Sequence, residues 1–214
     1  MTDGDGYNPG MTEPTETTTR IVTAAFDLIP ERGWAALSLS DVAEKAEVPL
    51  DEIRRIFPCK ASLLTGMAGW VETRARETPV AFEDEDTIRD RLFELLMERL
   101  DILADRRLAV ASILRDLQRA PFSVLPAVPA LLRHVGGILE EAGVATGLPA
   151  GPLRCKGLAG VWLATIAVWV DDDSPDSART MAALDRNLRR VEPLAQMLSP
   201  LSPRPAPSAE PGGF

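Results

Sequence analysis

The stretch that decides the fold is residues 48–64, VPLDEIRRIFPCKASLL. It opens as a short helix, since Pro49 suits a first helical turn and apolar residues then recur at helical spacing. Two adjacent arginines, Arg54 and Arg55, stand within that apolar pattern. Phe57-Pro58 ends the helix, because the residue before a proline is pushed out of helical geometry. A second apolar run starts at once, so the stretch predicts two helices joined by a tight turn.

Two further helical segments precede this stretch. Apolar residues recur at helical spacing over residues 18–32, and Gly33 ends that segment. A short helix then begins at Ser38, whose hydroxyl can cap it, with Asp41 in the capping-box position. A short helix, a turn and a second short helix in this order are typical of a helix-turn-helix, whose second helix contacts DNA.

The rest of the chain also has helical periodicity, and the alternating patterns of β-strands are missing. We predict an all-α fold of about nine helices, with a three-helix N-terminal helix-turn-helix head and a larger C-terminal helical bundle. The further helical segments are residues 59–77, 88–103, 108–120, 125–142 (interrupted by prolines), 153–170 and 177–198.

Composition divides the chain into four parts. Both ends are rich in residues that cannot bury much apolar surface, which predicts disorder there. An acidic connection separates the first domain from the second. The predicted parts are a disordered arm at 1–16, a helix-turn-helix domain at 17–78, a ligand-binding and dimerisation domain at 79–198, and a proline-rich disordered tail at 199–214.

Charge and length exclude several classes of protein. The chain of 214 residues has a formal net charge of −9, which argues against a protein that coats nucleic acid or anionic membranes non-specifically. A local positive patch is still compatible with DNA binding. The longest apolar run, residues 158–170, is shorter than the roughly 20 residues of a membrane-spanning helix. With no signal peptide pattern, we expect a cytoplasmic protein without an integral membrane segment.

The sequence has no pattern typical of an enzyme, a metal site or a cofactor site. Cys59 and Cys155 are too far apart for a zinc site, and His134 is the only histidine. The acidic run 171–176, DDDSPD, lacks the spaced ligands of a calcium loop. We interpret it as a turn, with Ser174 or Asp176 capping the last helix.

The order of the first elements resembles the TetR family of bacterial transcriptional regulators. The resemblance covers about residues 18–70 and is strongest in the pattern Phe57…Lys60-x-x-Leu63-Leu64. It implies a TetR-like fold, a homodimer that binds double-stranded operator DNA, and release from DNA by a small ligand in the C-terminal domain. Other positions that the family uses are Ala24, Gly33, Ser38, Asp41, Val42, Ala43, Ala46 and Val48.

The chain departs from the family pattern where the family contacts DNA. Glu47 replaces a glycine between the two short helices, and Pro49 replaces a serine or threonine. Asp51 and Glu52 stand where a small residue and a threonine are usual, and Arg54 replaces a tyrosine. The residues of the fold are kept, whereas those of DNA contact are largely changed.

A second resemblance covers residues 158–192. The order Trp162…Trp169-x-Asp171…Ser174-Pro175-Asp176…Leu184-Asp185-Arg186 is similar to the C-terminal part of the COQ9 family. Proteins of that family are lipid-binding accessory proteins of ubiquinone biosynthesis with a TetR-like fold. The resemblance implies an alternative function, lipid binding on the same fold without DNA.

The candidate DNA contacts surround two arginines and a lysine. A bidentate arginine can read guanine, and Lys60 at a helix start can hold a phosphate. Alternatively, Asp51 pairs with Arg54 or Arg55 as a solvated charged face. Residues 18–78 contain eight Lys and Arg against nine Asp and Glu, a net charge of −1. We assign to DNA contact Ser38, Ser40, Pro49, Asp51, Glu52, Arg54, Arg55 and Lys60.

The C-terminal helices supply the candidate dimer interface. The helix at 158–170 is apolar nearly all round, so it has two surfaces to bury. Trp162 and Trp169 lie seven residues apart on nearly the same face. We expect one face to contact a second copy through Leu158, Trp162, Thr165, Ile166, Trp169, Met181, Leu184 and Leu188.

The middle helices supply the candidate ligand pocket. Pro121, Pro126 and Pro129 interrupt helix packing there, which leaves room for a cavity; the alternative is a filled core. Because polar residues are few, the expected ligand is a small apolar molecule or a lipid. The residues we assign to the pocket are Met97, Leu100, Leu114, Leu117, Leu131, Val135 and Trp162.

Overall fold

The computed structural model describes residues 16–147 and 150–197. Within them the regular structure is entirely helical, as predicted, and no strand occurs. The predicted disorder of the arm and tail concerns residues outside this part of the chain, except that Glu16 begins the first helix. The nine α-helices in the described ranges are α1 (Glu16–Arg32), α2 (Leu39–Ala46), α3 (Leu50–Ile56), α4 (Lys60–Glu77), α5 (Ile88–Ile102), α6 (Arg107–Arg119), α7 (Val128–Glu141), α8 (Gly151–Trp169) and α9 (Ala178–Met197).

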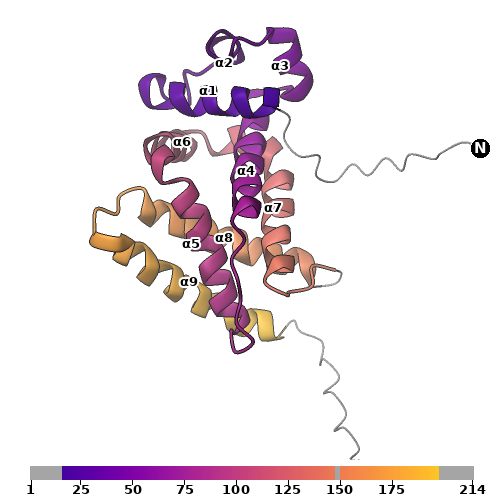
Figure 1. Ribbon diagram of the computed structural model, residues 1–214, viewed down its shortest axis with the longest axis vertical. Coiled ribbons are helices and arrows are strands. Elements are labelled where there is room, and N and C mark those ends of the chain that lie inside the picture. Colours follow the sequence, from indigo (N-terminus) through magenta and orange to yellow (C-terminus); the bar gives the residue numbers. More distant parts are fainter. Residues whose placement is uncertain (1–15, 148–149, 198–214) are drawn as a thin grey trace, which may run out of the picture.

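The first three helices form the head at one end of the molecule (Figure 1). Helix α4 runs from the head into the body, which consists of α4–α9. Helix α6 lies directly beneath the head, and α1 packs against both α4 and α6. The head therefore rests on the body through two helices that belong to the body.

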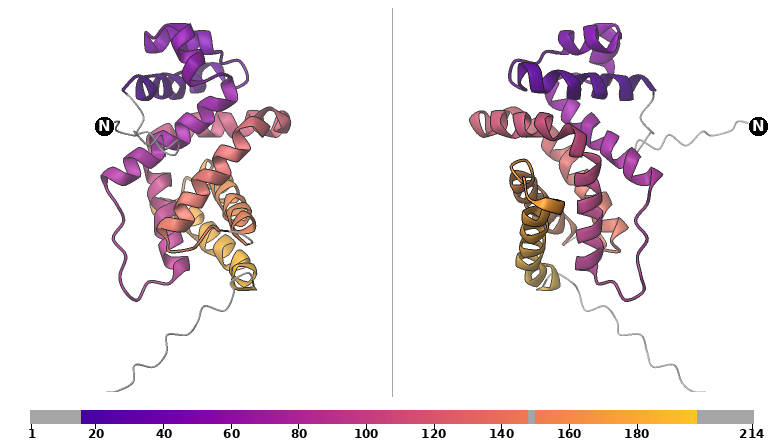
Figure 2. Two further views of the ribbon diagram at one scale, coloured as in Figure 1. Left: turned by 90° about the vertical axis from the view of Figure 1, so that its right-hand side faces the viewer. Right: turned by 60° about the vertical axis from the view of Figure 1, so that its left-hand side comes forward.

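Helices α8 and α9 pack along each other and form one flank of the body, on the side away from the connection at residues 78–87 (Figure 2). Helices α4, α5 and α7 of the body pack together on the other side. The proline-interrupted stretch predicted at 125–142 is two elements, a 3-10 segment, Pro121–Ala127, followed by α7. No helix in the described ranges is long and apolar enough to cross a membrane.

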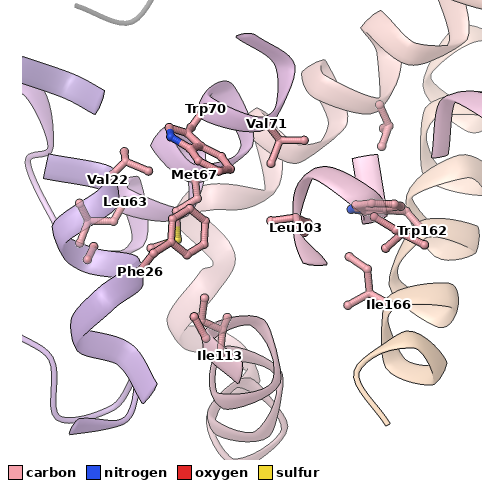
Figure 3. Close-up of a cluster of buried hydrophobic side chains, with 14 of the residues drawn as sticks. Val22, Phe26, Leu63, Met67, Trp70, Val71, Leu103, Ile113, Trp162 and Ile166 are labelled. Atoms are coloured by element: carbon pink, nitrogen blue, oxygen red, sulfur yellow. The ribbon is translucent and has the colours of Figure 1, made fainter. Parts of the chain in front are cut away.

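Two apolar groups fill the core (Figure 3). Where α1 crosses α4, Phe26 packs against Trp70 with ring centroids 5.4 Å apart. In the second group, Trp162 and Ile166 point from α8 into the body toward Leu103 (Figure 3). These side chains are buried in one continuous apolar core, which extends from the head into the body and fixes how the helices meet.

The helix ends follow local rules that are readable in the sequence. The predicted capping box on α2 forms, because the Ser38 hydroxyl accepts the Asp41 amide N–H at 3.2 Å and the Asp41 carboxylate accepts the Ser38 N–H at 2.9 Å. Gly33 follows α1 with φ of +82°, a conformation that favours glycine.

The acidic turn before α9 caps that helix through Ser174, one of the two residues we predicted, and through Asp172; the Ser174 hydroxyl accepts the Arg179 N–H at 3.2 Å. The buried Asp172 carboxylate accepts the Thr180 N–H at 2.7 Å and the Thr180 hydroxyl at 2.6 Å. Its hydrogen bonds with Ser174 and Thr180 hold the pKa of Asp172 well below its usual range. Asp176 instead has φ of +53° and does not supply the cap.

Candidate nucleic-acid interface

The face of α3 that points to solvent is set by its buried anchors. Ile53 is fully buried in the head, and Phe57 at the end of the helix is buried as well. At 3.6 residues per turn, the side of a helix opposite Ile53 is occupied by Asp51 and Arg55. Both are exposed, and Arg54 is exposed beside them. The helix thus presents a mixed acidic and basic surface away from the protein.

The exposed arginines are not paired with the neighbouring acids. Among the ion pairs formed by the described residues, none joins Arg54 or Arg55 to Asp51 or Glu52. The alternative prediction, in which Asp51 forms an ion pair with Arg54 or Arg55, is therefore wrong for this structure. Both guanidinium groups are positioned to contact a partner of the head.

The turn between α2 and α3 is held by a residue that sequence reasoning missed. Arg20 on α1 donates hydrogen bonds to the carbonyl oxygens of Ala46, at 2.6 Å, and Glu47, at 3.3 Å. Glu47 has φ of +54°, the left-handed conformation that explains the family's usual glycine at this position. The spacing of 26 residues between Arg20 and Ala46 is why local sequence patterns contain no signal for this contact.

Lys60 has a structural partner in place of the phosphate we assigned to it. Its ammonium donates hydrogen bonds to the carbonyl oxygens of Trp34 and Ala35, both at 2.9 Å, and lies 5.3 Å from the centre of the Trp34 ring. Partial burial lowers the pKa of Lys60, and the nearby Asp116 opposes that change. We therefore remove Lys60 from the proposed DNA surface, since its charge holds the loop between α1 and α2.

The remaining assigned residues lie around α2 and the start of α3. Ser38 is exposed but its hydroxyl is engaged in the capping box. Ser40 is exposed in the first turn of α2, and Pro49 is exposed at the start of α3. Glu52 is half-buried at the edge of the outward face. Ser40, Asp51, Arg54 and Arg55 are thus the side chains most available to a partner.

The loop that leads into α2 is fastened to the body. Asp116 on α6 accepts the Ala35 amide N–H at 2.7 Å, and Ser112 accepts the Trp34 amide N–H at 3.4 Å. On the same side, Arg106 forms an ion pair with Asp27 of α1. A displacement of α6 would therefore act directly on the position of the head.

The predicted dimer contacts face the interior of one chain. Leu158, Trp162, Thr165, Ile166, Trp169, Leu184 and Leu188 are all buried, and Met181 is half-buried. The outward face of α8 carries other residues at helical spacing, Gly160, Leu163, Ala164 and Ala167, and Leu163 is 45% exposed. Because α8 is apolar nearly all round, periodicity could not tell its inner face from its outer one. The exposed apolar side of α8 is therefore this outer face and not the face that carries the predicted contacts.

The structure contains an apolar cavity of about 80 Å³, but at a different place from the predicted pocket. None of the seven residues assigned to that pocket lines it: Leu100, Val135 and Trp162 are buried in the core, and Met97, Leu114, Leu117 and Leu131 are half-buried and pack against that core. The cavity opens between α5, α7, α8 and α9. Its lining is Ile88, Leu92, Leu139, Val144, Leu153, Arg154, Gly157, Leu158, Leu188 and Val191.

A buried ionic cluster in the body was also missed. Arg99 on α5 is 1% exposed and donates two hydrogen bonds to the Glu72 carboxylate, at 2.6 and 2.9 Å, and one to Glu141 at 2.8 Å. His134 lies 3.3 Å from the same Glu72 carboxylate. Burial lowers the pKa of His134, with Glu72 acting against this and Arg99 and Arg76 adding to it. The available signal was that Arg99 occupies the apolar stripe of its helix.

This fold occurs in known regulators. No family model matches the chain, and no curated protein matches it. The structure of a TetR transcriptional regulator from Nitrosomonas europaea has 28% identity and a TM-score of 0.58, with 85% of this chain and 98% of that chain covered. A TetR transcriptional regulator from Rhodococcus sp. RHA1 has 17% identity and a TM-score of 0.60, with 88% and 100% covered. A TetR-family regulator from Streptomyces coelicolor has 16% identity and a TM-score of 0.54, with 86% and 83% covered.

These neighbours are transcriptional regulators and not enzymes, and they span nearly the whole of the described chain. The resemblance of residues 158–192 to the COQ9 family finds no support among them. The predicted all-α, TetR-like arrangement of a helix-turn-helix head on a larger helical body is confirmed. The chain therefore resembles TetR transcriptional regulators in its fold, and it shares 28% of its sequence with the Nitrosomonas regulator.

Proposed function

We propose that this protein is a DNA-binding transcriptional regulator that works as a homodimer on a palindromic operator in the cytoplasm. The observation that carries the proposal is the outward face of α3, where Arg54 and Arg55 are exposed and unpaired with the neighbouring acids. A helix in this position of a helix-turn-helix enters the major groove, where arginine reads guanine and phosphates are neutralised by cations.

The two arginines have different tasks because they lie at different angles around α3. Arg55 lies opposite the buried Ile53 and points into the groove, so it is the candidate base reader. Arg54 lies toward the side of the helix, where the groove wall offers phosphates. Base reading and phosphate contact differ in how they depend on DNA sequence and on salt, so the two tasks can be told apart.

An electrophoretic shift over a salt series tests the proposal, with DNA that flanks the protein's own gene. We expect a specific complex that weakens steeply with salt. Arg55→Ala should lose about 1–3 kcal/mol and relax specificity at one base pair, whereas Arg54→Ala should weaken binding to all sequences and lower the salt slope by about 1. Arg115→Ala, an exposed arginine on α6, is the matched control and should leave binding unchanged. A wild-type protein that shifts no DNA at low salt would overturn the proposal.

The homodimer is proposed to form through the outer face of α8. Gly160, Ala164 and Ala167 are small, so a second helix can approach closely, and Leu163 supplies an exposed apolar side chain. Two heads held in this way have to match half-sites that are roughly 34–36 Å apart. The proposed interface thus serves DNA binding by setting the distance between the two copies of α3.

Leu163→Glu tests the interface, because it places a charge in the middle of the apolar contact. We expect a monomer in sedimentation experiments and a large loss of affinity for the palindromic site. Phe122→Glu is the matched control, since Phe122 is 80% exposed and belongs to the 3-10 segment before α7, away from α8. A Leu163→Glu protein that stays dimeric would contradict this interface.

The effector is proposed to be a small apolar molecule that enters the cavity between α5, α7, α8 and α9. At about 80 Å³ the cavity accepts a short alkyl segment, whereas pockets for whole drug-sized ligands are typically about 300–1,000 Å³. Arg154 at the lining is a cation that suits a polar or anionic end on such a chain. Helix α5, which lines the cavity, is followed by the 3-10 segment Ala104–Arg106 and then by α6, which is fastened to the head through Asp116, so ligand binding has a route to the DNA surface.

Octanoate and 1-octanol are suitable probes for this cavity. We expect either probe to raise the melting temperature and to weaken operator binding in the wild type. Gly157→Leu fills the cavity, because Gly157 lines it and a Cβ atom added there meets nothing within 4 Å. This variant should bind DNA normally and no longer respond to the probes. A response that persists in Gly157→Leu would place the effector elsewhere.

A further inference from the structure

The surface that α3 presents to DNA carries a negative charge at its centre. Asp51 lies one helical turn before Arg55, and both are exposed on the side opposite the buried Ile53. The α3 N-cap residue, Pro49, supplies no side-chain hydrogen bond to the helix, and within the described ranges no ion pair involves Asp51. A head seated in the major groove would therefore bring this carboxylate between two phosphate backbones.

We propose that Asp51 reads cytosine while Arg55 reads guanine, so that each operator half-site presents two G·C pairs in opposite orientation to α3. This inference rests on the proposed function and adds the base preference of the same surface. It makes Asp51 a specificity-determining residue, although its charge lowers affinity for DNA as a whole.

The preference for cytosine follows from what a carboxylate can accept. An ionised carboxylate is an acceptor only, so it needs a base edge that donates a hydrogen bond. In the major groove guanine offers N7 and O6, and thymine offers O4, all of which are acceptors that repel it. Adenine donates from N6, which lies between its own N7 acceptor and O4 of the paired thymine, whereas the cytosine amino group has an acceptor on one side only, O6 of the paired guanine. Cytosine is therefore the base that satisfies Asp51.

The spacing on α3 fits two separate base pairs. At a rise of 1.5 Å per residue, Asp51 and Arg55 are offset by about 6 Å along the helix axis. Successive base pairs are roughly 3.4 Å apart, so the two side chains reach bases about two steps apart. The arginine donates to O6 and N7 of guanine in bidentate fashion, and the carboxylate accepts from N4 of cytosine. One turn of the helix thus reads one donor edge and one acceptor edge.

The Asp51 carboxylate also lowers affinity for DNA sequences other than the operator. Its repulsion from the phosphates lowers affinity for every sequence, and its repulsion from guanine and thymine lowers affinity further for wrong sites. Removing the charge should therefore strengthen non-specific binding and weaken discrimination at the same time. Substitution of a residue that repels phosphates but contacts no base would change affinity alone. Measuring both affinity and base discrimination therefore distinguishes the two roles.

The test is selection of bound sequences from a DNA library with a randomised 20-base-pair centre, using the full-length protein and three variants. We expect the wild type to enrich sites with a cytosine about two base pairs from a guanine on the face that α3 contacts. Asp51→Ala should bind unselected DNA more tightly and discriminate about 10- to 100-fold less at the cytosine position, the range that one base contact supplies. Asp51→Asn should move the preference at that position to adenine, because an amide pairs with N6 and N7 of adenine.

Glu52→Ala is the matched control, since Glu52 is adjacent, equally charged and half-buried at the edge of the face. It should raise affinity without changing the selected bases. If Asp51→Ala raises affinity and leaves the base preference intact, the inference is wrong while the proposed regulator function stands. If the wild type enriches no sequence at any salt concentration, both the inference and the proposed function are overturned.

Discussion

Asp116 on α6 accepts the backbone N–H of Ala35 at 2.7 Å, across 81 residues of sequence. Ala35 lies in the loop between α1 and α2, whose carbonyl oxygens are at the same time bound by Lys60. One loop of the head is thus held by the body from two sides. Because this loop leads directly into the helix-turn-helix, the contact links the position of α6 to the position of α3.

Asp116→Ala should lower the free energy of unfolding by about 1 kcal/mol, because it removes a charge-assisted hydrogen bond to a backbone N–H at the edge of the head. Chemical denaturation measures the change. The control is Arg119→Ala, which removes the exposed partner of the Asp116 ion pair on the same helix and should change stability by less than about 0.5 kcal/mol. Equal effects of the two variants would show that the contact with Ala35 contributes nothing.

Gly66 and Gly69 on α4 should respond in opposite directions to alanine. A Cβ atom at Gly66 would lie 2.6 Å from the Phe57 ring, which closes α3 onto the head, so Gly66→Ala should cost about 1–3 kcal/mol. At Gly69 a Cβ atom meets nothing within 4 Å, and Gly69→Ala should stabilise by up to about 1 kcal/mol. Thermal unfolding of both variants is the measurement. A stable Gly66→Ala protein would mean that Phe57 moves aside freely.

The left-handed turn at Glu47 should be relieved by glycine. With φ of +54°, a residue with a side chain is strained there, and Glu47→Gly should stabilise the protein by about 0.5–1 kcal/mol. Glu44→Gly is the paired control, because Glu44 lies within the right-handed α2 and glycine there should cost about 1 kcal/mol. Opposite signs in denaturant melts are expected. Destabilisation by both substitutions would contradict the assignment of strain to Glu47.

Loss of Arg99 should be severe. Arg99→Met removes the buried guanidinium that donates hydrogen bonds to both Glu72 and Glu141, and both carboxylates lose these bonds. Breaking a buried pair in this way typically costs about 3–5 kcal/mol. Arg133→Met on the exposed side of α7 is the control and should be nearly neutral. Denaturant unfolding at neutral pH compares the two, and a small effect of Arg99→Met would refute a stabilising role for the cluster.

His134 should make the protein less stable as the pH falls below neutrality. Its pKa is lowered by burial, so below the ordinary value of 6.5 the unfolded chain binds the proton that the folded chain resists. Stability is then lost as the pH falls from about 7 toward the lowered pKa. Glu98 opposes this, because burial raises its pKa and favours the folded state at acidic pH.

The comparison that isolates His134 is the difference between wild type and His134→Gln. Unfolding free energies of both proteins are measured at pH 7.5 and 5.5, where Glu98 contributes alike to each. We expect the wild type to lose more stability over this interval than the variant. Identical losses would show that His134 is not held neutral in the folded protein.

Local patterns were sufficient for the elements of this fold. The capping box at Ser38, the stop at Phe57-Pro58 and the end of α1 at Gly33 all lie where the sequence predicts them. Each depends on hydrogen bonds and sterics within a few residues, so the sequence contains the complete information. The order of the first helices was enough for the helix-turn-helix as well.

Contacts between segments that are distant in the sequence could not be predicted from local patterns. The bonds from Lys60 to the loop at Ala35 and from Arg20 to Ala46 join residues 25 and 26 positions apart, and these partners meet only when the helices pack. Apolar periodicity likewise could not choose the inner face of α8, because that helix is apolar on almost every side. The cavity depended on the same choice and lies away from the residues first assigned to it.

By itself, therefore, the sequence determined which segments are helical and that the first three form a helix-turn-helix, because helix formation is decided largely by neighbours along the chain. Only the tertiary structure decided which side of α8 stays exposed, that Lys60 is bound to the loop at Trp34 and Ala35, and that Arg54 and Arg55 form no ion pair with Asp51 among the described residues. These outcomes depend on how helices from distant parts of the chain share one core, since packing determines which charges keep contact with water.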